Sequence, residues 1–164
     1  MDSYLPIKEQ KEIALLEAQG LSASGIDQTL EKADSSFQYQ KDISNQVLCP
    51  SSPPTKNAYL FGILDEEMTV RYTQYPIVIN DQLTTILKKI NPPERFFRFT
   101  LKCKKHDCQQ WHNDQCKLAV LVARSATDLA TEDIPKCAIR KSCRWFKQQG
   151  QTICRACQFI VTRG

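Results

Sequence analysis

The sequence predicts an α+β fold that ends in a cysteine-rich metal-binding module. Three patterns predict it: apolar residues recur about every 3.6 positions in residues 1–45, residues 58–74 show the two-residue alternation of strands, and seven of the eight cysteines lie between 103 and 157. A chain of 164 residues, 41% of them hydrophobic, is long enough for one compact domain with a small appendage. We expect a helical segment (1–47), a linker (48–57) and an α+β domain (58–164) that contains the cysteine-rich module (103–157).

The N-terminal segment is expected to form a helical hairpin. Its apolar residues are spaced as on one helix face, and Gly20 interrupts them where a helix C-cap would lie. Residues 12–26 resemble a helix-turn-helix, but they offer few side chains that could read bases and the segment is acidic. We therefore expect this hairpin to pack on the core or on a partner.

The linker is predicted from its composition, because residues 48–57 contain three prolines and no periodicity. Cys49 is the one cysteine in it and stands beside Pro50. A lone cysteine in a linker is expected to be incidental rather than a metal ligand.

A β-hairpin is predicted over residues 58–74, with the polar turn at 65–67 and a short extended run at 75–79. Asn80 can cap a helix over 81–90, which the following Asn-Pro-Pro ends.

Two further elements are predicted around the first cysteines. Residues 95–101 are apolar with interspersed arginines and are expected to form a strand leading to Cys103, and residues 116–125 are expected to form a helix.

Charge is distributed unevenly along the chain. Residues 1–94 carry 8 Lys and Arg against 13 Asp and Glu, a net charge of −5, whereas residues 95–164 carry 14 against 5, a net charge of +9. The basic half could dock an acidic redox partner or enzyme, bind nucleic acid, or simply form a solvated face; we rank nucleic acid last. No apolar run is long enough to span a membrane and no signal peptide is recognisable, so a cytoplasmic location is expected.

The cysteine spacing allows three kinds of site. A disulfide framework is disfavoured by the odd number of cysteines in the module and by the absence of a signal peptide. Structural zinc would take four Cys or His ligands, and the first three cysteines could form such a site with one nearby histidine. Its candidate ligands are Cys103, Cys108, Cys116, His106 and His112.

The third kind of site is an iron–sulfur cluster, which four thiolates hold at varied spacing. The last four cysteines, Cys137, Cys143, Cys154 and Cys157, make a complete ligand set. Lysines and arginines surround them and would offset the negative charge of the cluster, while neighbouring aromatic and aliphatic residues could shield it from solvent.

Residues 142–157 resemble the C-terminal motif of the siderophore-iron reductase family, which is Cys-Cys-x10-Cys-x2-Cys with an aromatic residue after the cysteine pair. Cys143, Cys154 and Cys157 match its last three cysteines, and Trp145-Phe146 and Gly150 also fit. The first position is Ser142 here, so Cys137 would have to supply the fourth ligand. The resemblance implies a [2Fe-2S] cluster, although a set built on Cys137 could equally hold a [4Fe-4S] cluster.

These patterns favour an iron–sulfur protein that acts in electron transfer or as a redox accessory to a partner enzyme. The alternative is a zinc-stabilised, non-enzymatic adaptor that binds a protein or nucleic acid. No nucleotide-binding loop, nucleophile elbow or zinc-protease motif occurs in the sequence.

Overall fold

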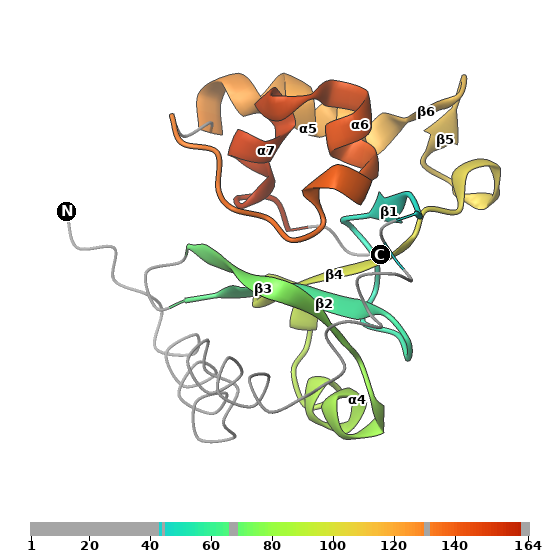
Figure 1. Ribbon diagram of the computed structural model, residues 1–164, viewed down its shortest axis with the longest axis vertical. Coiled ribbons are helices and arrows are strands. Elements are labelled where there is room, and N and C mark those ends of the chain that lie inside the picture. Colours follow the sequence, from blue (N-terminus) through green and yellow to red (C-terminus); the bar gives the residue numbers. More distant parts are fainter. Residues whose placement is uncertain (1–42, 44, 66–68, 130–131, 162–164) are drawn as a thin grey trace.

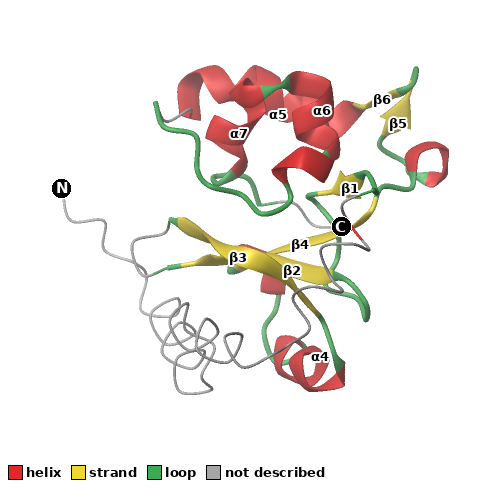
Figure 2. Cartoon of the chain, in the orientation of Figure 1, coloured by secondary structure: helices red, strands yellow, loops and turns green. Residues whose placement is uncertain are grey.

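The computed structural model describes residues 43, 45–65, 69–129 and 132–161. A four-stranded antiparallel sheet lies between helices on both of its faces, with α4 on one face and α5, α6 and α7 on the other (Figures 1 and 2). The predicted combination of helices and sheet is thus confirmed. The helical hairpin predicted over 1–47 lies almost wholly outside the described residues.

The sheet has the strand order β1-β4-β2-β3 and is built around the predicted hairpin. Its strands are β1 (Leu48–Cys49), β2 (Tyr59–Leu64), β3 (Val70–Val78) and β4 (Phe97–Lys102). Strand β3 continues through the run that the sequence predicts as a separate extended segment. Both the hairpin and the strand expected before Cys103 are confirmed.

One core lies between the sheet and α4 (Asp81–Leu87). This helix begins where predicted, because Asn80 Oδ1 accepts a hydrogen bond of 2.8 Å from the amide of Leu83. The short helix η1 (Pro93–Arg95) then leads into β4. The buried side chains of this core are Ala58, Leu60, Ile63, Ile79, Leu87, Phe96, Phe97 and Phe99.

A second core lies on the opposite face of the sheet and supports the candidate site. The helices that cover it are α5 (Lys117–Leu129), η3 (Arg140–Ser142), α6 (Arg144–Gln149) and α7 (Gln151–Cys157). The predicted helix at 116–125 is confirmed as α5, whereas α6 and α7 are too short for their periodicity to predict them. None of the described helices is long and apolar enough to cross a membrane.

A bulge in β2 directs one aromatic side chain into this second core. Leu60 pairs with Phe99 and Gly62 pairs with Arg98, so Phe61 has no partner of its own on β4. Phe61 therefore packs under the helices, while Leu60 belongs to the core on the α4 face. A Cβ at Gly62 would lie only 2.8 Å from Cγ1 of Val70 on the neighbouring strand, so any larger residue here would force that side chain to move.

The segment that the sequence predicts as a linker is packed along β4. Leu48–Cys49 pairs antiparallel with Leu101 and Lys102. Ser52 extends this contact, because its hydroxyl accepts from the Leu101 amide at 2.9 Å and donates to the Cys49 carbonyl at 3.0 Å. One short strand and one serine side chain therefore hold this proline-rich segment against β4.

A small excursion follows β4 and contains the first group of cysteines. It comprises the helix η2 (Lys105–Asp107) and the hairpin of β5 (Trp111–His112) and β6 (Gln115–Cys116), which leads directly into α5.

Candidate metal centre

The four cysteines predicted to hold a cluster line one cavity. Cys137 lies in the irregular segment before η3, Cys143 immediately precedes α6, and Cys154 and Cys157 lie one turn apart on α7. Gly150, with φ of 68°, lies between the two helices and reverses the chain. This reversal folds α7 back toward Cys143 and brings cysteines from two helices and a loop to the same place.

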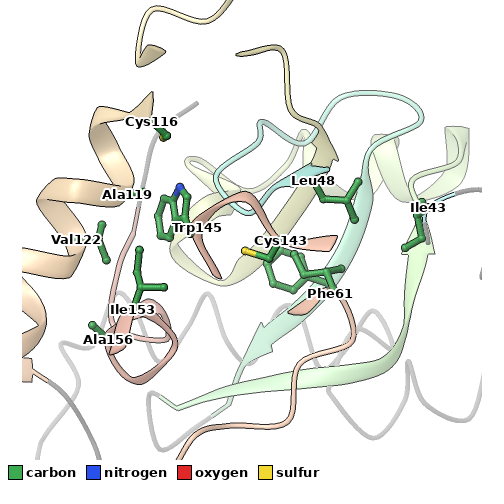
Figure 3. Close-up of a cluster of buried hydrophobic side chains, with 11 residues drawn as sticks. Ile43, Leu48, Phe61, Cys116, Ala119, Val122, Cys143, Trp145, Ile153 and Ala156 are labelled. Carbon is green, nitrogen blue, oxygen red and sulfur yellow. The ribbon is translucent and has the colours of Figure 1, made fainter. Parts of the chain in front are cut away.

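The cavity lies between the helices and the sheet. Its other walls are apolar or aromatic side chains and one guanidinium group: Pro50, Phe61, Tyr72, Pro135, Ile139, Arg140, Trp145 and Ile153. In Figure 3 the sulfur of Cys143 points to the side of Trp145 and Ile153 and away from Leu48. The cavity measures about 20 Å³, which is room for about one water molecule.

Hydrogen-bond donors face each of the four sulfur atoms. Backbone amides at the starts of η3 and α6 act on Cys137 and Cys143, respectively. The Tyr72 hydroxyl donates to Cys157, and the Arg140 side chain donates to Cys154. Donors of this kind stabilise a thiolate relative to a thiol and tune the potential of thiolate-ligated clusters.

Burial opposes these donors and keeps the thiols neutral. It raises the pKa of Cys137 to about 11 and that of Cys157 to about 12, and a Cys137 thiolate would raise the pKa of Cys157 further. Burial also raises the pKa values of Cys143 and Cys154. A bound metal would therefore have to displace protons from the thiols, as metal binding to cysteine generally does.

A buried arginine supplies positive charge next to the cavity. Arg98 in β4 is only 7% exposed, and its guanidinium donates to the carbonyl oxygens of Glu94, Phe97 and Gln158. Burial lowers its pKa, and the acidic groups that oppose this effect are Cys157 and Tyr72. A buried cation is costly unless a negative charge compensates it, and here the neighbouring acidic groups are a thiol and a phenol.

Several buried donors close to the cysteines find no hydrogen-bond acceptor in the part of the chain that the structure describes. They include Nε of Arg98, of Arg140 and of Arg155. Buried donors are normally satisfied, so these atoms need an acceptor that the described side chains do not provide. Thiolates and the sulfides of a cluster are acceptors, and four thiols, buried cations and free donors together fit a thiolate-ligated metal group.

The four cysteine side chains are not arranged in a metal-coordination geometry in this structure. Among the described residues, no group of three or more His, Cys, Asp or Glu side chains has the arrangement that a metal ion requires. The four thiols thus share a cavity without converging on one point.

The structure places the other predicted ligands outside this cavity. Cys103 follows β4, Cys108 ends η2 and Cys116 lies in β6, and none of the three lines the cavity. His106 and His112 are both exposed, and the His106 ring lies edge-on to Trp111 at a centroid distance of 5.5 Å.

Residues that the sequence did not single out complete the site. Tyr72 and Arg98 come from strands that precede the cysteines by more than 35 positions, and no local motif points to them. The sequence offers only a weak indication of them, namely that each is a polar residue within a predicted strand.

No protein-family model, no curated protein and no solved structure shows significant similarity to this chain.

Proposed function

We propose that Cys137, Cys143, Cys154 and Cys157 hold an iron–sulfur cluster and that the protein transfers electrons or serves as a redox accessory to a partner enzyme. The observation that carries this proposal is that four thiols line one cavity beside a buried arginine, for which the described residues supply no compensating carboxylate. A thiolate-ligated cluster is anionic and would provide the missing negative charge.

The wall of the cavity supports a redox group rather than a purely structural ion. Phe61, Tyr72 and Trp145 surround the thiols, and Phe61 stacks on Tyr72 with ring centroids 5.9 Å apart. An apolar, aromatic shell excludes water, which controls the potential of a cluster and its stability toward oxidation. A structural zinc ion needs no such shell.

The chain's own residues would have separate tasks. The thiolates bind the iron atoms, Tyr72 donates a hydrogen bond to Cys157, and Arg98 and Arg140 balance charge. When bound, the cluster would supply the capacity to accept and release single electrons. The resemblance of residues 142–157 to siderophore-iron reductases supports the same cofactor, and its type, [2Fe-2S] or [4Fe-4S], is open.

The surroundings of the site favour an acidic partner. Residues 136–157 contain six lysines and arginines and no Asp or Glu. Lys136 and Lys141 are exposed next to the cavity-lining residues Cys137 and Arg140. A cationic rim would orient a negatively charged redox protein for electron transfer.

One observation favours the second candidate, a zinc-stabilised adaptor. The cavity of about 20 Å³ is closer in size to a single ion than to a cluster. A cluster would have to widen the wall, and the irregular segment that carries Pro135 and Cys137 is a part of that wall without regular secondary structure. Zinc would leave the site colourless and redox-inactive.

The two candidates are separated by replacing the cysteines one at a time. Cys143→Ser and Cys157→Ser should each reduce the iron content of anaerobically purified protein by at least tenfold, because a cluster needs all four thiolates. Ala138→Ser, which adds a hydroxyl at an exposed position beside Cys137, is the matched control and should retain iron. Full iron content in both cysteine variants, or zinc in place of iron in the wild type, would contradict the proposal.

A further inference from the structure

The remaining four cysteines come together at one corner of the sheet, apart from the cavity. Cys49 in β1 pairs with Leu101 in β4, and Cys103 lies two residues beyond Leu101. Since side chains two apart on a strand share a face, continuing this register places Cys49 and Cys103 on the same side. The Cys103 amide donates to the Val47 carbonyl at 2.8 Å, so the pairing extends that far.

Cys108 and Cys116 are brought to this corner by the small hairpin. Cys116 is the cross-strand partner of Trp111, and the Trp111 amide donates to the Cys108 carbonyl at 2.9 Å. The thiols of Cys103 and Cys116 are both near enough to Cys49 that a negative charge on either would raise the pKa of Cys49. The corner therefore collects thiols from β1, the end of β4, η2 and β6.

Two of these sulfurs already accept hydrogen bonds from the chain around them. The Gln110 amide donates to Sγ of Cys108 at 3.4 Å. The Ser51 amide donates to the sulfur of Cys49. In both loops the donating amide is two residues beyond the cysteine.

The excursion that carries these cysteines has no core of its own. Not one of residues 102–115 is buried, and its strands are two residues long. Lys105, Asn113 and Asp114 have positive φ values of 49°, 47° and 60°. Such a segment cannot be held by apolar burial, and small coreless segments are commonly held by a structural metal.

We propose that Cys49, Cys103, Cys108 and Cys116 form a second metal site, a structural zinc site with four thiolate ligands. Cys49 replaces the histidine that the sequence suggested, because His106 and His112 are exposed and His106 packs against Trp111. As at the cavity, the described side chains are not arranged around an ion, so these thiols would have to move toward one another to bind it. Redox-inert zinc needs no apolar shield, in keeping with the exposure of the excursion that supplies Cys103 and Cys108, whereas Cys116 is buried and Cys49 is half-buried.

Metal analysis of the full-length protein tests this assignment. The wild type should contain one zinc per chain at this corner, Cys49→Ser should lose it, and the double variant His106→Ala/His112→Ala should keep it. Iron at the cavity should be unchanged in Cys49→Ser, and zinc at the corner should persist in Cys143→Ser, so the failure of one site is distinguishable from the failure of the other. Zinc that persists in Cys49→Ser and disappears in the histidine variant would overturn the proposal.

X-ray absorption at the zinc edge identifies the ligand atoms of the zinc even if Cys49→Ser does not fold. Measured on Cys143→Ser, in which the cavity lacks a ligand, the first shell should consist of four sulfur atoms at about 2.3 Å. A shell that contains a nitrogen at about 2.0 Å would assign a histidine and contradict the role of Cys49.

Discussion

Two residues that no motif predicts set the electrostatics of the cavity. Tyr72 donates a hydrogen bond to Cys157, and Arg98 places a buried cation beside the same thiol. Both come from strands of the sheet, whereas the four cysteines come from the helical layer. The candidate ligands can be identified from the sequence because cysteine is rare and chemically distinctive, but the charge and the hydrogen bonds around them depend on tertiary packing.

Tyr72→Phe should lower the reduction potential of the cluster by roughly tens of millivolts. The variant keeps the ring that stacks on Phe61 and removes only the hydroxyl. A hydrogen bond to a charged group contributes about 1.5–3 kcal/mol, and it favours the reduced, more negative state. Protein-film voltammetry measures the change, with Tyr75→Phe on the exposed part of β3 as control. Equal potentials in Tyr72→Phe and the wild type would exclude Tyr72 from the site.

Phe61→Ala should destabilise the protein by about 3–5 kcal/mol, the usual cost of removing a buried phenylalanine. Phe61 is 1% exposed and lies in the core beneath the helices and in the wall of the cavity. Urea denaturation with the metals bound measures the loss. Val78→Ala, at a position 45% exposed on the edge strand β3, should cost far less. A loss below 1 kcal/mol in Phe61→Ala would show that the bulge does not direct this ring into the core.

At the scale of elements, α6 connects the two groups of cysteines. Cys143 immediately precedes this helix, and Gln148 near its end holds the backbone of Cys116. The Cys116 amide donates to Oε1 of Gln148 at 2.9 Å, and Nε2 of Gln148 donates to the Cys116 carbonyl oxygen at 3.1 Å. The small hairpin is held again by Arg144, whose guanidinium lies 4.4 Å from the centre of the Trp111 ring.

Gln148→Ala should therefore loosen the hairpin and the zinc corner. The loss of two partly buried hydrogen bonds that leave backbone groups unpaired should cost about 2 kcal/mol. We expect faster transfer of zinc to a chromogenic chelator, with iron content unaffected. Gln149→Ala removes the neighbouring glutamine of the same helix and serves as the control. Identical zinc release rates in the two variants would mean that this contact does not support the corner.

The elements themselves were largely predictable, and the exceptions have physical causes. The hairpin of β2 and β3, the Asn80-capped helix, β4 and α5 have periodicity or caps that depend on local sequence. Helices α6 and α7 are six and seven residues long, which is too short for periodicity to be read. β1 was missed because its pairing depends on Ser52 and β4 rather than on its own two residues.

Cys49 could not be predicted as a ligand from the sequence for the same reason that β1 was missed, since both depend on strand pairing with β4. As a single cysteine beside a proline in a segment without periodicity, it carried no local signal of being a ligand. Only the pairing of Cys49 with Leu101 brings it to Cys103 and the hairpin. The count of thiols was the available clue, because three cysteines in the first group and one unassigned cysteine make a set of four.

At the scale of the whole molecule, β1 lies between the two proposed sites. Leu48 forms a bridge with Cys143, Cys49 belongs to the zinc corner, and Pro50 lines the cavity. Three consecutive residues thus contact both groups of cysteines. The proposed redox site lies in the packed helical layer, and the proposed zinc site would join β1 to the excursion that follows β4.

Reversing charge beside the cavity should slow electron exchange with an acidic partner. The double variant Lys136→Glu/Lys141→Glu replaces two exposed cations beside the cavity with anions. Reduction of this variant by an acidic plant-type ferredoxin should be slower than reduction of the wild type by roughly tenfold or more at low salt. Stopped-flow absorbance measures the rate. Lys88→Glu/Lys89→Glu, at the end of α4 on the opposite face, is the charge-matched control. Equal slowing by both pairs would indicate an effect of net charge alone and contradict docking at the cavity.

The presence of a cluster on the four thiols is tested most directly by an absorption spectrum of anaerobically purified wild-type protein, combined with iron, zinc and acid-labile sulfide analysis. We expect broad absorbance near ~400–460 nm with iron and sulfide in equal amounts, in addition to one zinc per chain. A colourless protein that contains zinc at both groups of cysteines, without sulfide, would contradict it and make the protein a zinc-stabilised binding module.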